Sequence, residues 1–325
     1  MREPTCFIVP RRVLEHYKDY QSAWLSERIR GHRDSAPLAA FGAVPAGEKR
    51  RTVYDAGGKT KLPGKLVRGE GDPPSADVLV NEAYDSAGST YDFYLAVLKR
   101  NSIDGNGLRL DSSVHYSKNY NNAFWNGKQM VYGDGDGKLF RNFPSALDVV
   151  AHELTHGVTQ YTVPGGLNYE DQSGALNESI SDVFGSVVKQ WKANQTVGDA
   201  DWLIGAGIMV PPDCHALRSM KDPGNPAVTW PNDDQPKNMS NYVPGGDVHT
   251  NSGIPNHAFY LAAMALGGSS WDKAGRIWFR ALGLLTPTAT FRDAATATSQ
   301  AAAILHGHKG TEQKAVDDAW RAVGV

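Results

Sequence analysis

Two histidines four residues apart, with a glutamate directly after the first, are the residues best placed to do chemistry. They are His152, Glu153 and His156, within the run of residues 149–157. If this run is helical, the two imidazoles share one face and can bind one metal ion beside a carboxylate that accepts a proton. The spacing favours zinc-dependent hydrolysis with Glu153 as general base. The alternative is a surface helix with two solvated histidines.

The helix that must position these residues is predicted to begin near Ala146, because Ser145 and Asp148 form an S-x-x-D start signal. Its apolar residues fall in one arc and the histidines on the opposite side. One face is thus expected to pack on a core while the histidine face forms the wall of a cleft.

A second helix, predicted over residues 175–188, carries Glu178 and Asp182 four positions apart. Like charges at this spacing repel each other unless a cation lies near. A solvated acidic face is one interpretation. The other is a zinc site in which Glu178 is the third ligand and Asp182 accepts the free N–H of a ligating histidine.

Composition excludes several classes of function. With 325 residues and 41% apolar residues, one large domain or two ordinary ones are expected. A net charge of −2 gives no general attraction to nucleic acid or anionic membranes. Cys6 and Cys214 are too few for a disulfide framework. The apolar run at residues 6–9 is too short for a signal peptide, and no segment reaches the ~18 apolar residues of a membrane span. We therefore expect a soluble protein.

The N-terminal residues, 1 to about 50, differ from the rest. An amphipathic helix is predicted over residues 13–29, followed by a tract rich in Ala, Gly and Pro. Composition leaves two interpretations open, an arm packed on the core or a removable pro-segment. The chain beyond is strand-rich before the histidine helix and helical after it. The predicted elements are a hairpin over 52–68, a helix over 75–100, strands over 108–116 and 123–132, and helices over 255–266, 271–285, 290–307 and 311–324.

Several blocks of sequence, in this order, resemble the thermolysin family of zinc endopeptidases. They are residues 113–116, 121–127, 132–137, 152–156, 174–182, 217–220 and 248–253. The short N-terminal segment is similar to that of the protealysin-type branch, so the resemblance implies a pro-segment and not an arm.

The resemblance implies an α+β fold with two lobes, a β-rich N-terminal lobe and an α-helical C-terminal lobe with the zinc helix between them. The expected domains are a pro-segment and linker at 1–50, a β-rich lobe at 51–162 and a helical lobe at 163–325. The pro-segment would act as an intramolecular inhibitor until self-cleavage between Ala36 and Arg51.

The resemblance also assigns roles in peptide hydrolysis. The implied ligands of one catalytic zinc ion are His152, His156 and Glu178, with a fourth position left for water. Glu153 would take the proton of that water, and Tyr169 and His249 would stabilise the oxyanion.

Further residues would support the zinc ligands and bind substrate. Asp182 would orient His152, and Asn177 would contact His156. The implied backbone-binding groups are Asn122, Ala123 and Arg218, and the implied apolar pocket is formed by Phe140, Phe143, Val149 and Leu217. Cleavage is thus expected on the amino side of bulky apolar residues.

The sequence departs from the family at three points, one of which is Ser145-Ala146 in place of the glycine pair often found before the zinc helix. Pro244 stands where the family has an acidic partner for His249, and Asp247 is the candidate replacement. Lys189 stands where the family's double calcium site has a carboxylate, so we expect no such site and little calcium dependence. Cys6 is either a small buried hydrophobe or a thiolate that plugs the zinc site.

The leading hypothesis is therefore a monomeric, self-processing zinc endopeptidase with polypeptide substrates and no nucleic-acid or membrane partner. The resemblance implies secretion by a non-classical route, with the cytoplasm as the alternative location. The competing function is a non-catalytic zinc-bound pseudoenzyme that acts as a binding protein. Glu153 argues against it, because zinc binding does not require this residue.

Overall fold

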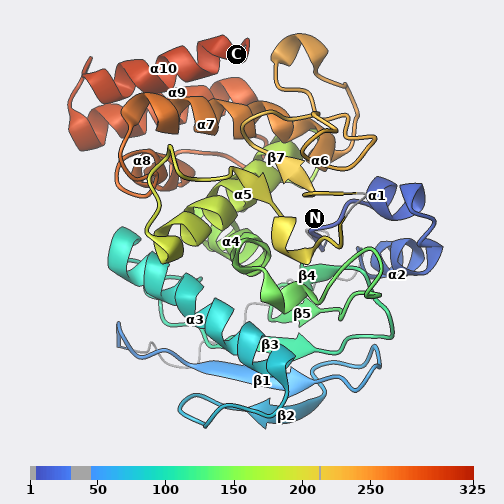
Figure 1. The fold of residues 1–325 in the computed structure, drawn as a ribbon. Helices are drawn as coiled ribbons and strands as arrows, with labels where there is room; N and C mark the ends of the chain where they lie inside the picture. Colours follow the sequence, from blue (N-terminus) through green and yellow to red (C-terminus); the bar gives the residue numbers. More distant parts are fainter. Residues whose placement is uncertain (1–4, 31–44, 212–213) are drawn as a thin grey trace. The chain divides into compact units, whose positions relative to one another are not determined.

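The computed structural model describes residues 5–30, 45–211 and 214–325, and Figure 1 shows its fold. The chain forms two compact units, residues 1–157 with 205–217 and residues 158–204 with 218–325. The elements of the first unit are α1 (Arg11–His16), α2 (Tyr20–Arg30), β1 (Arg51–Asp55), β2 (Lys65–Arg68), α3 (Val78–Leu98), β3 (Leu110–Val114), β4 (Ala123–Trp125), β5 (Met130–Tyr132) and the 3₁₀ turns η1 (Phe143–Ser145) and η2 (Ala206–Ile208).

The helix α4 (Leu147–Thr162) crosses from the first unit into the second. The other elements of the second unit are α5 (Asp171–Ala193), β6 (Leu203–Ile204), β7 (Arg218–Ser219), η3 (Met239–Asn241), α6 (Val248–Asn251), α7 (Gly253–Leu266), α8 (Ala274–Leu282), α9 (Phe291–His306) and α10 (Thr311–Ala322). The family-derived boundaries at 50/51 and 162/163 stay predictions, since the compact units part at Gly157 and residues 205–217 join the first unit.

A five-stranded mixed sheet organises the first unit, in the order β2-β1-β3-β5-β4. The central pairs β1–β3 and β3–β5 are parallel, and the outer pairs are antiparallel hairpins. Helix α3 packs along β1 and β3 (Figure 1). The predicted hairpin over 52–68 is confirmed. The single strand predicted over 123–132 is a hairpin, because the side chain of Asn126 accepts hydrogen bonds from the backbone N–H groups of Lys128 and Gln129 and turns the chain.

The single helix predicted over residues 13–29 is wrong, because the chain forms α1 and α2 with a break between them. Lys18 adopts a left-handed backbone conformation with φ 63°. Asp19 then starts α2, since its carboxylate accepts a hydrogen bond from the backbone N–H of Ser22 at 3.0 Å. The amphipathic pattern continues across the break, which is why periodicity alone does not reveal it.

Helix α4 begins one residue after the predicted start and ends at Thr162, directly before the Pro164 region. Its start signal works differently from the prediction, because the hydroxyl of Ser145 donates to the backbone oxygen of Asn142 at 2.7 Å. On the histidine face, His152 and His156 are at most 1% exposed. The cleft predicted at this face stays a prediction.

Helix α5 is the central element of the second unit and contacts α6, α7, α8 and α9. Its residues 173–188 are all buried, so both its apolar and its polar groups lie in the interior. The predicted start of α9 is confirmed, because Thr290 and Asp293 form a reciprocal capping box. Trp278 on α8 stacks on Trp320 of α10 and joins the C-terminal helices.

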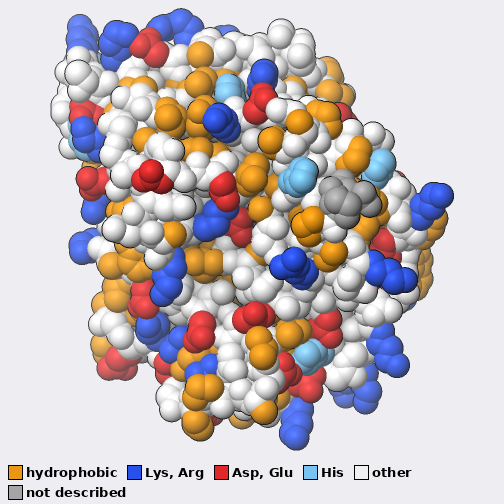
Figure 2. Space-filling model, viewed as in Figure 1, with side chains coloured by type: hydrophobic (Ala, Val, Ile, Leu, Met, Phe, Trp, Pro, Cys, Tyr) orange, Lys and Arg blue, Asp and Glu red, His pale blue; other side chains and the backbone are white. Residues whose placement is uncertain are grey.

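Acidic and basic side chains are intermixed over the face shown in Figure 2, as the small net charge implies. Among the described residues, no helix combines the length and apolar content that a membrane crossing needs.

Candidate metal and catalytic site

The two histidines of α4 lie together in the interior of the first unit. Their Nε2 atoms are 3.1 Å apart, and the ring planes are nearly perpendicular at 85°. Two nitrogens on a tetrahedral zinc ion, each about 2.0–2.1 Å from it, are about 3.3 Å apart. The separation of His152 and His156 therefore fits a shared zinc ion, and two buried imidazoles are ligands that zinc prefers.

Glu153 is fully buried beside this pair, and the strand β4 fixes its carboxylate. Its Oε2 atom accepts a hydrogen bond from the backbone N–H of Trp125 at 3.0 Å. Burial raises the pKa of Tyr132, and the nearby carboxylate of Glu153 raises it further. The next turn of α4 is held by Thr155, whose hydroxyl contacts that of Tyr94 at 2.8 Å.

Gly157 allows α4 to approach β4 closely at this point. A Cβ atom at Gly157 would lie 2.5 Å from Ile103 and 3.4 Å from the ring of Trp125. A larger residue would therefore push the helix, with both histidines, away from the strand that holds Glu153.

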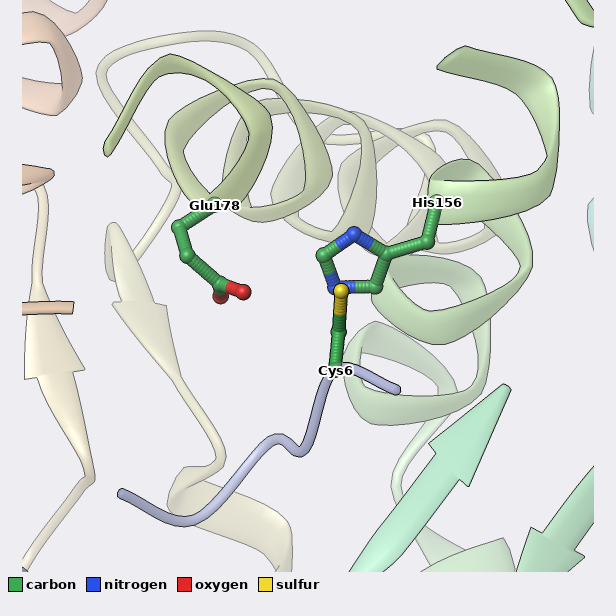
Figure 3. Close-up of side chains that lie close together, drawn as sticks. All are labelled: Cys6, His156 and Glu178. Atoms are coloured by element: carbon green, nitrogen blue, oxygen red, sulfur yellow. The ribbon is translucent and has the colours of Figure 1, made fainter. Parts of the chain in front are cut away.

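Three further predicted residues meet in the second unit. Glu178 projects from α5 (Figure 3), and the hydroxyl of Tyr169 donates a short hydrogen bond to its Oε1 atom. Nε2 of His249 lies 3.3 Å from Oε2 of the same carboxylate. The two residues predicted to stabilise the oxyanion thus flank the predicted zinc ligand. The predicted ligands belong to different units, so their shared coordination stays a prediction.

Asp247 takes the position next to His249 that Pro244 leaves without an acid. Its Oδ1 atom lies 2.9 Å from Nδ1 of His249 and also accepts the backbone N–H of His249 at 2.8 Å. Because the carboxylate accepts at Nδ1, the proton is placed there and Nε2 is directed toward Glu178. On its other side, Gln235 donates to the backbone oxygen of His249 at 2.6 Å.

Asp182 forms a buried ion pair with Arg218. The guanidinium donates through Nε and Nη2 to both carboxylate oxygens, each at 2.8 Å, and Asn256 donates to Oδ2 at 2.8 Å. Burial lowers the pKa of Arg218, but the facing Asp182 more than offsets this and raises it. The contacts predicted for Asp182 with His152, for Asn177 with His156 and for Arg218 with substrate stay predictions.

The residues of the predicted apolar pocket are all buried in the first unit. The rings of Phe140 and Phe143 lie 5.7 Å apart, and Val149 and Leu217 are at most 1% exposed. Leu217 reaches this unit because residues 205–217 fold with it.

The predicted substrate-binding groups Asn122 and Ala123 are bonded to the N-terminal segment. The side chain of Asn122 accepts from the backbone N–H of Val9 and donates to its oxygen, both at 3.0 Å. The backbone N–H of Ile8 donates to the oxygen of Ala123 at 3.3 Å. Backbone groups of the N-terminal segment therefore occupy the hydrogen-bonding groups of these two residues.

Sequence reasoning missed several residues that hold the site. Asn256, Gln235 and Trp125 each donate a hydrogen bond to a predicted site residue, and no spacing pattern in the sequence indicates them. Asn121 and Asn122 belong to the block 121–127 that resembles the family, but their partners Asp19, Ser22 and Ser26 lie about 100 residues earlier in the sequence.

Lys189 lies on α5, at the position where the resemblance implies a carboxylate ligand of the family's double calcium site. Its Nζ atom contacts Asp201 at 2.9 Å and the backbone oxygen of Leu203 at 2.7 Å. The ammonium group thus supplies a positive charge to this loop from within the chain.

Known proteins match almost the whole chain. Residues 47–160 match the thermolysin metallopeptidase catalytic domain, and residues 165–325 match the thermolysin metallopeptidase alpha-helical domain. An extracellular metalloprotease of Pectobacterium carotovorum subsp. carotovorum is 52% identical over 87% of this chain and 83% of its own. Protease PrtS of a Photorhabdus species is 46% identical over 85% and 76%.

The fold matches a solved structure over nearly its full length. The precursor of protealysin, a metalloproteinase from Serratia proteamaculans, superposes with a TM-score of 0.87 at 45% identity, covering 98% of this chain and 99% of that one. The predicted two-domain α+β fold is confirmed. The chain is a metallopeptidase and belongs to the thermolysin family.

Proposed function

We propose that this metallopeptidase is a zinc endopeptidase that cuts polypeptides before bulky apolar residues and is made as a self-processing zymogen. The observation that carries the proposal is the buried group of His152, His156 and Glu153, with its 3.1 Å separation between imidazole nitrogens. Glu178 is proposed as the third ligand on the strength of the family match. A bound zinc ion would lower the pKa of its water and polarise the peptide carbonyl.

Glu153 would accept the proton of the attacking water and pass it to the leaving amine. The hydrogen bond from Trp125 holds one carboxylate oxygen, which orients the other. Tyr169 and His249 would donate hydrogen bonds to the developing oxyanion. The contact with Asp247 supports this role of His249, because the carboxylate holds the ring through Nδ1. Nε2 would donate from the imidazolium form, in which both ring nitrogens carry a proton.

The N-terminal segment would keep the precursor inactive by occupying groups that a substrate needs. Val9 and Ile8 bond to Asn122 and Ala123, which are the proposed backbone-binding residues. Cleavage is proposed in the stretch from Ala36 to Arg51, whose first part lies outside the described residues. The match over nearly the full length to a metalloproteinase precursor supports the same assignment.

Substrate preference would come from the buried group of Phe140, Phe143, Val149 and Leu217, which suits Leu, Phe or Ile after the cut. The name of the Pectobacterium relative supports action outside the cell. We further propose that the chain works as a monomer, which sedimentation of the processed protein would test.

The deciding experiment compares the chain with its Glu153→Gln variant. The amide is isosteric and can still accept the hydrogen bond from Trp125, but it cannot take a proton. We expect the parent to shorten by about 50 residues, as its domain order implies, and to cleave casein. The variant should stay full-length, with activity lower by about 10²–10⁴-fold or more.

The two chains should bind equal amounts of zinc and have similar unfolding midpoints. A parent that binds zinc but stays full-length and inert would instead support the non-catalytic binding protein. Peptides with Leu and with Asp after the cut would then test the specificity of an active enzyme.

A further inference from the structure

Cys6 is buried against one of the histidines of α4. Its side chain is 1% exposed and is directed toward the imidazole of His156 (Figure 3). The sulfur lies within 4.8 Å of a ring nitrogen of that histidine. A thiolate and an imidazole on one tetrahedral zinc ion are about 3.6 Å apart, so a small movement brings the sulfur to a coordinating position.

Neighbouring contacts fix where Cys6 points. Phe7 packs into an aromatic cluster, with its ring 5.2 Å from that of Phe124. This packing of Phe7 anchors the backbone next to Cys6, whose side chain is directed toward His156 (Figure 3).

The segment is also fastened on both sides of the cysteine. Thr5 donates its backbone N–H to the oxygen of Arg30 at 2.9 Å, and Ile8 and Val9 bond to Ala123 and Asn122. Contacts of Thr5, Phe7, Ile8 and Val9 thus hold the backbone on both sides of Cys6.

The other cysteine offers a comparison within the same chain. Cys214 is also buried and outside any disulfide, but its thiol donates to the backbone oxygen of Ala216 at 3.3 Å. In the described residues, the cluster of possible metal ligands includes Cys6 and not Cys214.

We propose that Cys6 is a ligand of the metal in the full-length chain and occupies the position that the attacking water needs. This inference rests on the proposed zinc function and adds a regulatory ligand to it. The thiol releases its proton to solvent as the sulfur binds, and the thiolate takes up a proton when the segment leaves and water enters. The covalent structure of the chain and the oxidation state of the metal do not change.

The test uses cobalt(II) in place of zinc, because a thiolate bound to cobalt produces a near-ultraviolet charge-transfer band that histidine and carboxylate ligands do not. Full-length Glu153→Gln protein, which should not process itself, is loaded with cobalt and compared with the same protein carrying Cys6→Ser or Cys214→Ser. We expect the band in the parent and in Cys214→Ser, and its loss in Cys6→Ser. The visible cobalt bands should remain in all three.

Cobalt bound without the charge-transfer band in the parent would overturn the role of Cys6 and leave the proposed zinc site intact. A band that survives in Cys6→Ser would also overturn it. Failure of every variant to bind cobalt would contradict the zinc function itself, so the two failures are distinguishable.

A kinetic measurement gives a second readout in the chain that retains Glu153. Loss of the thiolate should speed self-processing of Cys6→Ser by about tenfold or more, a factor that corresponds to 1.4 kcal/mol. Cys214→Ser should process at the parent rate. Equal rates for all three chains would count against the inference.

Discussion

Buried polar groups are satisfied in different ways in the two units. In the second unit, Asp182 and Arg218 neutralise each other inside one folded body. In the first, Asn122 bonds to Val9 and Ser26, neutral groups of the N-terminal segment. Removing one charge of a buried pair leaves the other uncompensated, whereas an asparagine that loses a neutral partner can bond to water or substrate. The difference indicates that the ion pair of Asp182 and Arg218 is permanent, whereas the hydrogen bonds of Asn122 to the N-terminal segment can be replaced.

The largest expected effect comes from breaking the charged pair. Arg218→Met in the Glu153→Gln background should lower the free energy of unfolding by about 3–5 kcal/mol, because it leaves Asp182 buried and unpaired. Chemical denaturation would measure this. Lys314→Met is the control, since its ion pair with Asp318 is exposed and should have almost no effect. An equally small change in both variants would contradict the comparison.

A charged cluster inside the first unit tests whether charge, and not the choice of unit, makes contacts permanent. His115 lies between Asp134 and Asp77, and these carboxylates raise its pKa to about 9 from 6.5. Protonated His115 and its two carboxylates therefore stabilise the fold fully below pH 6.5, and this stabilisation is lost as the pH rises through about 9.

We therefore expect His115→Gln to destabilise the protein by about 1–2 kcal/mol below pH 6.5, after allowance for solvent screening. The loss should shrink toward alkaline pH. Thermal unfolding across pH, with and without residues 1–50, would measure it. A loss that depends on the N-terminal segment, or grows with pH, would refute this account.

A smaller effect is expected for the neutral contacts. Ser26→Ala removes hydrogen bonds to Tyr120 and Asn122 and should cost the full-length chain about 1–2 kcal/mol. Self-processing should become faster. The processed enzyme lacks residue 26, so its stability and activity should be the same whether it comes from the parent or from Ser26→Ala. Gln21→Ala, at an exposed position of the same helix, should behave as the parent. An unchanged processing rate in Ser26→Ala would show that these contacts do not hold the segment.

The smallest effect is expected for calcium. Lys189 already places an ammonium group against Asp201 and Leu203, so millimolar calcium should not measurably raise the melting temperature. A ligand stabilises only in proportion to its occupancy of a native site. A rise of several degrees, absent with magnesium, would show a calcium site that the positive charge does not prevent.

The sequence predicted the parts of the fold that depend on local pattern. The start of α9, the hairpin of β1 and β2 and the helix that carries His152 and His156 follow from caps, turns and spacing. The roles of Glu178 and His249 could be proposed only through several motifs in family order, because they lie far from α4 in sequence.

Other features could not be read from local pattern. The break at Lys18 leaves the apolar periodicity of α1 and α2 uninterrupted. The pairing of Arg218 with Asp182 joins residues 36 positions apart. Arginine and aspartate are common at the surface, so their residue types alone do not predict a buried ion pair. Phe7, which anchors the backbone next to Cys6, packs into an aromatic cluster whose other members lie more than 100 residues later in the sequence.

The contacts that fasten the N-terminal segment also bear on the order of folding. The hydrogen bonds of residues 5–30 with the rest of the unit join residues 94 to 115 positions apart in the sequence, from Ser26–Tyr120 to Ile8–Ala123. Contacts that close such long loops form late, after strands β3 to β5 have built the surface they bind. We expect a chain that starts at residue 51 to fold unaided and to bind a separate peptide of residues 5–30. If that shorter chain cannot fold, the N-terminal segment is required for folding of the enzyme. If it folds, the segment docks last, onto an enzyme that is already folded.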